Sequence, residues 1–182
     1  MFSEISLHIL DILQNSVCAY ATVIKIHITK QKYSNEMIVI INDNGFGMTK
    51  KQREECCNPF FTTKKNKTAG LGIPFFKYAA ELTGGNFHIE SCINKGTTIK
   101  AIFNTDSIDC IPLGDIFSTI YSQIVTNPNI CFQWIIDIND VSVNYSSKNI
   151  AQKYYEKSSL PASMLYEEIK YLKSELKYLN II

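Results

Sequence analysis

The sequence lacks any long uninterrupted run of apolar residues. Its longest runs, such as Met37–Ile41, are far shorter than the roughly 18 residues that a membrane-spanning helix needs. The opening residues Met1–Glu4 also lack the basic stretch with which a secretory signal peptide begins. We therefore expect a cytoplasmic protein that has no membrane partner.

An excess of charge of one sign is also lacking. The 18 lysines and arginines nearly balance the 17 aspartates and glutamates, and the formal net charge is +1. A chain so balanced offers no overall electrostatic attraction to nucleic acid or to an anionic membrane. We therefore expect no nucleic-acid partner.

The cysteines lack the C-x-x-C spacing that zinc sites and redox sites use. Without an export signal, reduced and mostly packed thiols are expected rather than metal ligands or disulfides. The six residues are scattered along the chain, at Cys18, Cys56, Cys57, Cys92, Cys110 and Cys131.

What the sequence does have is the composition of a folded chain, with 46% apolar and 19% charged residues. Its length allows a main domain of about 100 residues with a smaller appendage. The residue composition changes after Phe103, because residues Asn104–Ser107 are polar and Pro112 follows them. We therefore expect one domain over residues 1–105 and a C-terminal α/β extension of unknown role over residues 106–182.

Hydrophobic periodicity predicts alternating helices and strands in the first domain. Apolar residues recur at the helical period from Ile5 to Tyr20, and they alternate in the manner of a strand from Val23 to Thr29. Together the patterns predict a helix over 5–20, strands over 23–29 and 36–42, a short helical turn over 49–55, a helix over 73–82, and strands over 86–92 and 97–103.

The extension is predicted to add a helix over 113–125, strands over 130–138 and 141–145, and a final helix over 161–179. In the final helix, apolar residues alternate four and three residues apart, as in a coiled-coil seam. The seam spans only about two heptads, so packing against the chain's own domain is favoured over a homodimer through residues 162–179. The seam consists of Leu165, Ile169, Leu172, Leu176 and Leu179.

Four short motifs occur in a fixed order, and each is weak alone. Asp11 and Asn15 lie four residues apart on the first predicted helix and therefore share one of its faces. Asp43 ends a buried-looking strand, and the glycines after it let the backbone turn sharply. A third motif, Gly70-Leu71-Gly72, leads into a helix, and a fourth, Gly96-Thr97-Thr98, opens a strand.

In this order the motifs resemble those of the GHKL ATPases, the superfamily of gyrase, heat-shock chaperones, histidine kinases and mismatch-repair ATPases. Asn15 matches the N box of these proteins. Asp43–Met48 matches their first glycine box, Gly70–Ile73 their second glycine box, and Gly96–Thr98 their last box. The resemblance covers residues 1–105 and is nearest to histidine-kinase-like ATP-binding domains. It implies an α/β fold, a two-layer sandwich of a mixed sheet and helices (the Bergerat ATP-binding fold), with ATP and Mg²⁺ as cofactors.

The resemblance implies roles at the phosphate end of such a site. Asn15 would reach a Mg²⁺ ion that bridges the ATP phosphates, since this hard cation takes oxygen ligands. Asp11 resembles the general base of the family's true ATPases, although that residue is usually glutamate and aspartate is one methylene shorter. The alternative for Asp11, and for His8 one turn earlier, is that both are solvated polar residues.

The resemblance also implies roles around the adenine ring. Asp43 would accept a hydrogen bond from the adenine amino group, and Gly45 and Gly47 would let the backbone approach the ligand closely. Thr97 resembles a threonine that contacts adenine, often through water. The alternatives are a plain turn after Asp43 and a buried strand threonine at Thr97.

The segment Asn58–Lys64 resembles the F box and the start of the ATP lid of histidine kinases, and Lys65 and Lys67 beyond it are expected only to solvate the loop. In the second glycine box, backbone amides at the start of the following helix would point at phosphate oxygens, helped by the helix dipole. The candidate nucleotide contacts in these two motifs are Phe60, Thr62, Thr63, Lys64, Gly70, Leu71, Gly72 and Ile73.

The resemblance identifies the bound nucleotide better than it identifies what the protein does with that nucleotide. The N box begins almost at residue one, so we expect no phosphoacceptor domain ahead of it, and we expect no autophosphorylation of His8, His27 or His88. One hypothesis is an enzyme, either a stand-alone signalling protein kinase similar to anti-sigma-factor serine kinases or a slow ATPase that uses Asp11. The other is a nucleotide-dependent binding module that engages a partner protein with little turnover.

Overall fold

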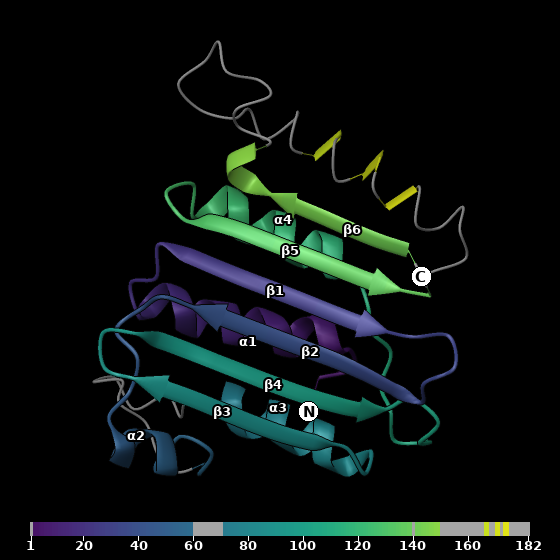
Figure 1. Ribbon diagram of the computed structural model, residues 1–182, viewed down its shortest axis with the longest axis horizontal. Coiled ribbons are helices and arrows are strands. Elements are labelled where there is room, and N and C mark those ends of the chain that lie inside the picture. The colour runs from purple at the N-terminus through teal and green to yellow at the C-terminus, as the bar shows by residue number, and fades with distance from the viewer. Residues whose placement is uncertain are drawn as a thin grey trace.

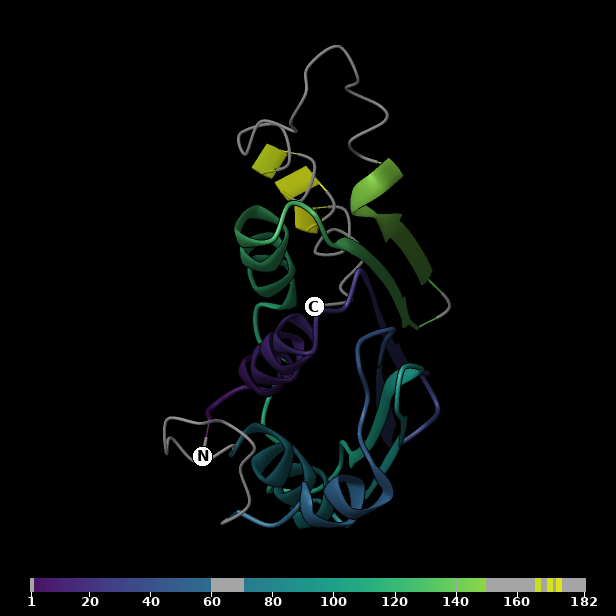
Figure 2. The same cartoon turned by 90° about the vertical axis from the view of Figure 1, so that its left-hand side faces the viewer.

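The protein is described by a computed structural model for residues 2–59, 71–139 and 141–149, and for residues 166–167, 170–171 and 173–174. Six strands form one mixed sheet in the order β3-β4-β2-β1-β5-β6 (Figure 1). The helices α1, α3 and α4 lie on one face of this sheet (Figure 2). The prediction of a two-layer α/β sandwich with a small α/β C-terminal extension is therefore confirmed.

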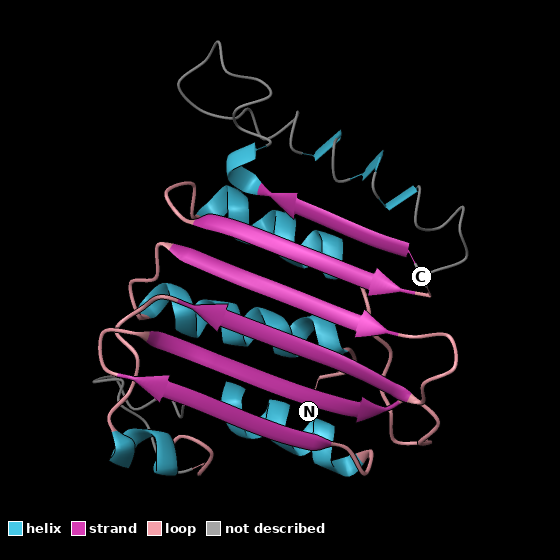
Figure 3. Ribbon diagram, in the orientation of Figure 1, coloured by secondary structure: helices cyan, strands magenta, loops and turns pink. Residues whose placement is uncertain are grey.

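The helices and strands are coloured separately in Figure 3. The helices are α1 (Ile5–Cys18), α2 (Lys50–Glu55), α3 (Gly72–Leu82) and α4 (Ile116–Thr126). The strands are β1 (Val23–Lys30), β2 (Glu36–Asp43), β3 (Asn86–Cys92), β4 (Gly96–Asn104), β5 (Cys131–Ile138) and β6 (Val141–Ser146). Each element overlaps a helix or strand that periodicity predicts.

The start of α4 departs most from its prediction, because residues 112 and 113 are engaged elsewhere. The first amides of α1, at Ile5 and Ser6, donate to the carbonyl oxygens of Pro112 and Leu113 at 2.9 and 2.8 Å. Glu4 at the N-cap of α1 provides no side-chain cap, so these carbonyls take over that function. The helix α4 begins only at Ile116, capped by the side chain of the residue before it.

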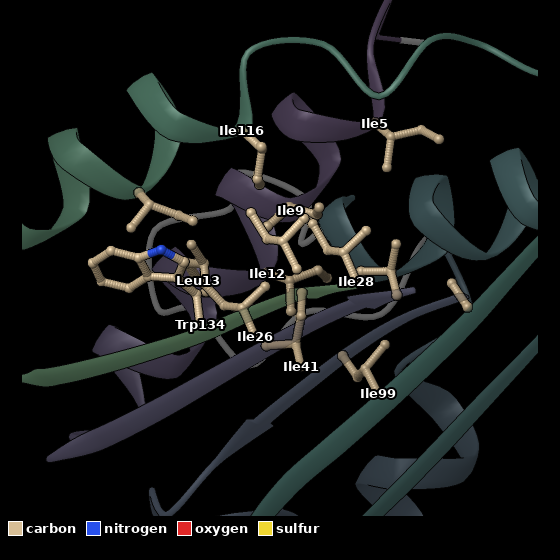
Figure 4. Close-up of a cluster of buried hydrophobic side chains, with 14 of the residues drawn as sticks. Ile5, Ile9, Ile12, Leu13, Ile26, Ile28, Ile41, Ile99, Ile116 and Trp134 are labelled. Carbon is tan, nitrogen blue, oxygen red and sulfur yellow. The ribbon is translucent and has the colours of Figure 1, made fainter. Parts of the chain in front are cut away.

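The core lies between α1 and the sheet. Apolar side chains of α1, including Ile9 and Leu13, point toward Ile26 of β1 and Ile41 of β2 (Figure 4). Successive strand residues alternate between buried and more exposed positions, so one face of each central strand lines this core. The burial of α1 fixes the position of the polar residues that the same helix carries.

The sheet and the core continue across residue 105. Strand β5 pairs in parallel with β1, and Trp134 of β5 joins the same buried cluster as Ile116 of α4 and Ile9 of α1. The division of the chain after residue 105 remains a prediction, although no break in the sheet marks it within the described residues.

The described part of the predicted final helix contacts α4. Lys173 forms an ion pair with Asp115 at the N-cap of α4, and the rings of Tyr166 and Tyr121 lie 5.8 Å apart between centroids. The five residues of the predicted coiled-coil seam lie outside the described residues. No helix in the described part of the chain is long and apolar enough to cross a membrane.

The alternative that His8 is a solvated polar residue is wrong. Its side chain is 0% exposed, stacks on Phe76 of α3 with ring centroids 6.0 Å apart, and meets the edge of Phe2. Neither ring nitrogen has a hydrogen-bond partner among the described residues. Burial lowers the pKa of His8 to about 4, so the imidazole is neutral at physiological pH.

This burial makes stability depend on pH. The unfolded chain, with a His8 pKa near the ordinary 6.5, binds more protons than the folded chain down to the folded pKa of about 4. The free energy of unfolding should therefore fall by about 3 kcal/mol as the pH drops through this window. Replacing His8→Phe should remove that part of the pH dependence in urea denaturation. An unchanged slope in this variant, with exposed His88→Asn as control, would contradict the assignment.

Candidate functional site

The predicted N box and second glycine box meet where α1 and α3 pack together. Asp11 and Asn15 are half-buried on α1, and Gly72 is the first residue of α3. A Cβ atom added at Gly72 would lie 3.0 Å from Cβ of Asp11, 3.3 Å from its Oδ2 atom and 3.6 Å from Nδ2 of Asn15. The missing side chain of Gly72 therefore lets α3 begin directly against the carboxylate and the amide.

The start of α3 has the features of an anion site. Leu71 occupies the N-cap position and provides no side-chain hydrogen bond to the first turn. The first amides of a helix lack intrahelical acceptors and carry partial positive charge, so a phosphate can satisfy them. Asp11 and Asn15 lie next to this helix start, on the side where Gly72 leaves room. The structure thus brings together Asp11, Asn15, Leu71 and Gly72.

Asp43 ends β2 as a buried carboxylate, with only 6% of its surface exposed. Its Oδ2 atom accepts a hydrogen bond from the hydroxyl of Ser16 at 2.9 Å, and its Oδ1 atom accepts one from the amide of Gly45 at 2.8 Å. Ser16 directly follows Asn15 on α1. The serine therefore connects the N box to the first glycine box.

Thr97 lies opposite Asp43 in the register of β2 and β4. Residues opposite each other in an antiparallel pair project from the same face, so the threonine and the carboxylate share one side of the sheet. The hydroxyl of Thr97 lies 2.9 Å from that of Ser91 on β3, which also donates to the carbonyl oxygen of Gly96 at 3.0 Å. Ser91 thus fixes the rotamer of Thr97 beside Asp43.

Both glycines of the first box pack closely against the protein's own backbone. A Cβ atom at Gly45 would lie 2.6 Å from the carbonyl oxygen of Ala19, and one at Gly47 would lie 2.0 Å from that of Cys92. Gly47 also has a φ of +65°, which side chains disfavour. These contacts give the two glycines a structural role that the sequence did not indicate.

The loop that carries these glycines is fixed at both sides by hydrogen bonds. The amide of Phe46 donates to the carbonyl oxygen of Ala19 at 2.9 Å, and the carbonyl oxygen of Phe46 accepts from the amide of Asn94 at 2.7 Å. The side chain of Asn44 accepts from the amides of Thr22 and Val23. The loop after Asp43 is therefore a rigid part of the fold.

The remaining predicted contacts divide into two groups. Ile73 packs against the hydrophobic core, so its side chain helps to anchor α3. The others lie outside the described residues: Phe60, Thr62, Thr63, Lys64 and Gly70.

Two serines at the site were missed by the sequence analysis. Ser16 and Ser91 are both buried, and each positions a predicted site residue through its hydroxyl. The placement of Ser16 beside Asn15, on the face of α1 next to the strand end, is a signal that could have identified it. Ser91 gives no such signal, because its pairing with Thr97 depends on the register of β3 and β4.

Comparison with known proteins gives one family match. Residues 3–107 match the family described as "Histidine kinase-, DNA gyrase B-, and HSP90-like ATPase". The signal transduction histidine-protein kinase ArlS of Staphylococcus aureus is 31% identical over 84 residues, which are 43% of this chain and 19% of ArlS. The aligned stretches cover only 15% to 19% of the curated relatives that come first among the matches.

One solved structure shows a similarity of fold over most of this chain. The match to the N-terminal domain of a DNA repair protein covers 80% of this chain and 52% of the chain of that structure, with 14% identity and a TM-score of 0.54. The match to a mycobacterial sensor histidine kinase, MprB, covers 53% of this chain and 66% of the MprB chain, with 20% identity and a TM-score of 0.41. The first similarity covers a larger share of the chain than residues 3–107, so the shared fold includes part of the C-terminal extension.

The contact at Gly72 can be tested by Gly72→Ala. The added Cβ would have to displace Asp11 by a few tenths of an ångström, and we expect the affinity for a non-hydrolysable ATP analogue, measured by calorimetry, to fall about tenfold, the equivalent of about 1.4 kcal/mol. Gly84→Ala is the control, since it adds strain at a φ of +78° with no atom within 4 Å of the new Cβ. Equal affinities of Gly72→Ala and wild type would show that this contact does not shape the site.

Ser16→Ala should weaken nucleotide binding through Asp43. The change removes a buried hydrogen bond to a carboxylate, a kind of bond that contributes about 1.5–3 kcal/mol. We expect at least a tenfold loss of affinity for the same analogue. Ser6→Ala is a matched control, because Ser6 is also buried on α1 and donates to a carboxylate, that of Glu4, away from the site. Equal losses in both variants would contradict a positioning role of Ser16.

Proposed function

Because this chain belongs to the histidine kinase-, DNA gyrase B- and HSP90-like ATPase family, we propose that it binds ATP as the magnesium complex and uses Asp11 to direct a nucleophile at the γ-phosphate. The observation that carries the proposal is the convergence on α1. One face of this helix places Asp11 and Asn15 against the start of α3. Ser16, which follows Asn15, donates a hydrogen bond to the buried Asp43. The phosphate end and the adenine end of the candidate site are therefore connected through a single rigid element.

The chemistry of Asp43 fits adenine. An ionised carboxylate offers about four acceptor positions, and two of them are used by Ser16 and Gly45. A further position can accept a hydrogen bond from the exocyclic amino group of adenine. Guanine carries a carbonyl oxygen at the same place, and an oxygen facing a buried carboxylate would be repelled. The site should therefore prefer ATP to GTP.

The residues beside Gly72 also fit a magnesium ion. The described residues contain no group of three or more His, Cys, Asp or Glu side chains that could enclose a metal by themselves. Mg²⁺ rarely needs such a cage, since it keeps several waters and binds substrate phosphates together with one or two protein oxygens. The amide oxygen of Asn15 is the proposed protein ligand, and a bound ion there would neutralise phosphate charge.

Asp11 is the proposed catalytic residue. A carboxylate beside the phosphate-binding helix start can accept a proton from water, which gives hydrolysis, or from a hydroxyl group of a protein substrate, which gives phosphorylation. Both reactions need the same placement of the base, and they differ only in the nucleophile. We propose a signalling protein kinase or a slow ATPase on this basis.

The proposal is tested by phosphate release from Mg-ATP, comparing wild type with Asp11→Asn. General-base catalysis contributes about 10²–10⁴-fold, so the variant should bind nucleotide normally and release phosphate at least a hundredfold more slowly. Asp109→Asn is a matched control, because it makes the same change of charge at an exposed position.

Two other outcomes would change the conclusion. Hydrolysis that is equal in wild type and Asp11→Asn would rule out Asp11 as the base. If both proteins bind ATP and neither releases phosphate, alone or with a protein substrate, the alternative function stands, which is a nucleotide-dependent module that engages a partner protein with little turnover.

A further inference from the structure

Three loops lie at one end of the sheet, where β1 and β4 begin and β2 and β3 end (Figure 1). They are residues 18–22 at the end of α1, residues 44–49 after β2, and residues 92–96, where β3 turns into β4. The amide of Phe46 in the second loop donates to the carbonyl oxygen of Ala19 in the first, and the carbonyl oxygen of Phe46 accepts from the amide of Asn94 in the third. The three loops therefore form one continuous surface.

This surface exposes large apolar side chains. Tyr20, Phe46 and Ile93, one from each loop, are 76%, 60% and 57% exposed. The rings of Tyr20 and Phe46 contact each other, with centroids 5.3 Å apart. Single exposed apolar residues are normal on a protein surface, but a group of them indicates an interaction site.

The cysteines add to this surface, contrary to expectation. All six are free, and Cys56 alone is buried, so the expectation that most of them are packed is wrong. The two that are exposed, Cys18 and Cys92, both lie in these loops. A reduced thiol behaves as a small apolar group, so both residues extend the apolar surface. We call Cys18, Tyr20, Phe46, Cys92 and Ile93 the apolar patch.

Tyr20 has a backbone conformation that its residue type disfavours. It follows the C-cap residue of α1 with a φ of +57°, and at this position glycine or asparagine adopts such a left-handed conformation more readily. The exposed ring gains little from burial that could offset this strain. Strained residues gather at functional sites, where the conformation serves a purpose other than stability. Here the conformation holds the ring of Tyr20 against Phe46.

Positive charge borders the apolar patch. Lys95 is the one charged residue in the sequences of the three loops, and the first charged residues after the other two loops are Lys25 and Lys50. All three lysines are exposed. Among the ion pairs of the described residues, none includes Lys25 or Lys95. Their charge is therefore available to a partner.

The carboxylates nearest to the loops in sequence are engaged within the protein. Asp43 precedes the second loop, where it is buried and hydrogen-bonded. Glu90 precedes the third loop and lies 3.0 Å from the ring of His88, and Glu54 lies 4.0 Å from Lys50. A partner that approaches the patch thus meets apolar side chains and a positive border, which acidic residues complement.

We propose that the apolar patch is a docking surface for an acidic segment of a partner protein. The segment packs apolar side chains on Tyr20, Phe46 and Ile93, and its carboxylates lie near Lys25 and Lys95. Tyrosine is well suited to this task, because aromatic anchors contribute a large share of the binding energy at protein interfaces. Docking here goes beyond the proposed function and does not depend on ATP binding.

The experiment selects binders from a library of random peptides displayed on phage, with the full chain as bait and without nucleotide. Enriched peptides are synthesised, and their affinity is measured by fluorescence anisotropy at low and high salt. We expect these peptides to combine aromatic or aliphatic residues with aspartate or glutamate, and their affinity to fall as the salt concentration rises. Enrichment of basic or uncharged peptides, or of none, would overturn the proposal.

Tyr20→Asn removes the aromatic ring and spares the backbone, because asparagine tolerates a positive φ. We expect the affinity for the selected peptides to fall about tenfold, whereas the thermal midpoint should not fall. Tyr33→Asn is the matched control, since Tyr33 is an exposed tyrosine at the opposite end of the sheet. Equal affinities in the two variants would rule out docking at the patch.

Lys95→Glu tests the charge, and Lys32→Glu, next to Tyr33, is its matched control. We expect Lys95→Glu to weaken peptide binding several-fold and to reduce its salt dependence, because the new carboxylate repels an acidic segment. Equal binding by these two variants would overturn the assignment of an acidic partner.

A second copy of the chain is the alternative occupant of the patch. Sedimentation of wild type and Tyr20→Asn over a range of concentrations distinguishes it from a partner protein. Under the proposal, both sediment with the same mass. A wild-type dimer that Tyr20→Asn converts to a monomer would show that the patch joins two copies, and the proposal would then be wrong.

Discussion

The burial of α1 against the sheet is the constraint on which the candidate site depends. The helix packs its apolar face on the central strands and lies between α3 and α4, and its first amides are capped by carbonyl groups that precede α4. Its polar residues reach Gly72 on one side and Asp43 on the other. A rotation of α1 by even a fraction of a turn would move Asp11 and Asn15 away from Gly72 and, at the same time, Ser16 away from Asp43. Protein interiors are densely packed and leave few alternative arrangements for such a helix.

The elements of the fold were predictable because they depend on local patterns. The alternation in β1 and the helical period in α1 each describe one buried face, and the structure confirms both. His8 could not be assigned in this way, since α1 also packs against α3 and so buries more than a single apolar stripe. Its burial depends on Phe76, a residue far away in sequence, and periodicity contains no information about that contact.

At the candidate site too, the sequence indicated which residues matter but not what each of them contacts. The motifs indicated which residues gather, and the structure places Asp11, Asn15 and Gly72 together. The glycines of the first box were expected to let the backbone approach a ligand, and the structure adds a second reason for them, since Gly45 and Gly47 also leave room for neighbouring carbonyl groups of the chain. A glycine motif alone cannot distinguish these two reasons, because both require only the absence of a Cβ atom.

The pairing of β5 with β1 has a consequence for any attempt to isolate the part of the chain that contains the four motifs. A fragment that ends near residue 105 would leave β1 as an open edge of eight residues, with its row of backbone donors and acceptors ready to pair with another molecule. It would also lose the carbonyl groups that cap α1 and the indole of Trp134 from the core. During synthesis, the candidate site can therefore be completed only after these distant residues have been made, because they secure the helix that carries it.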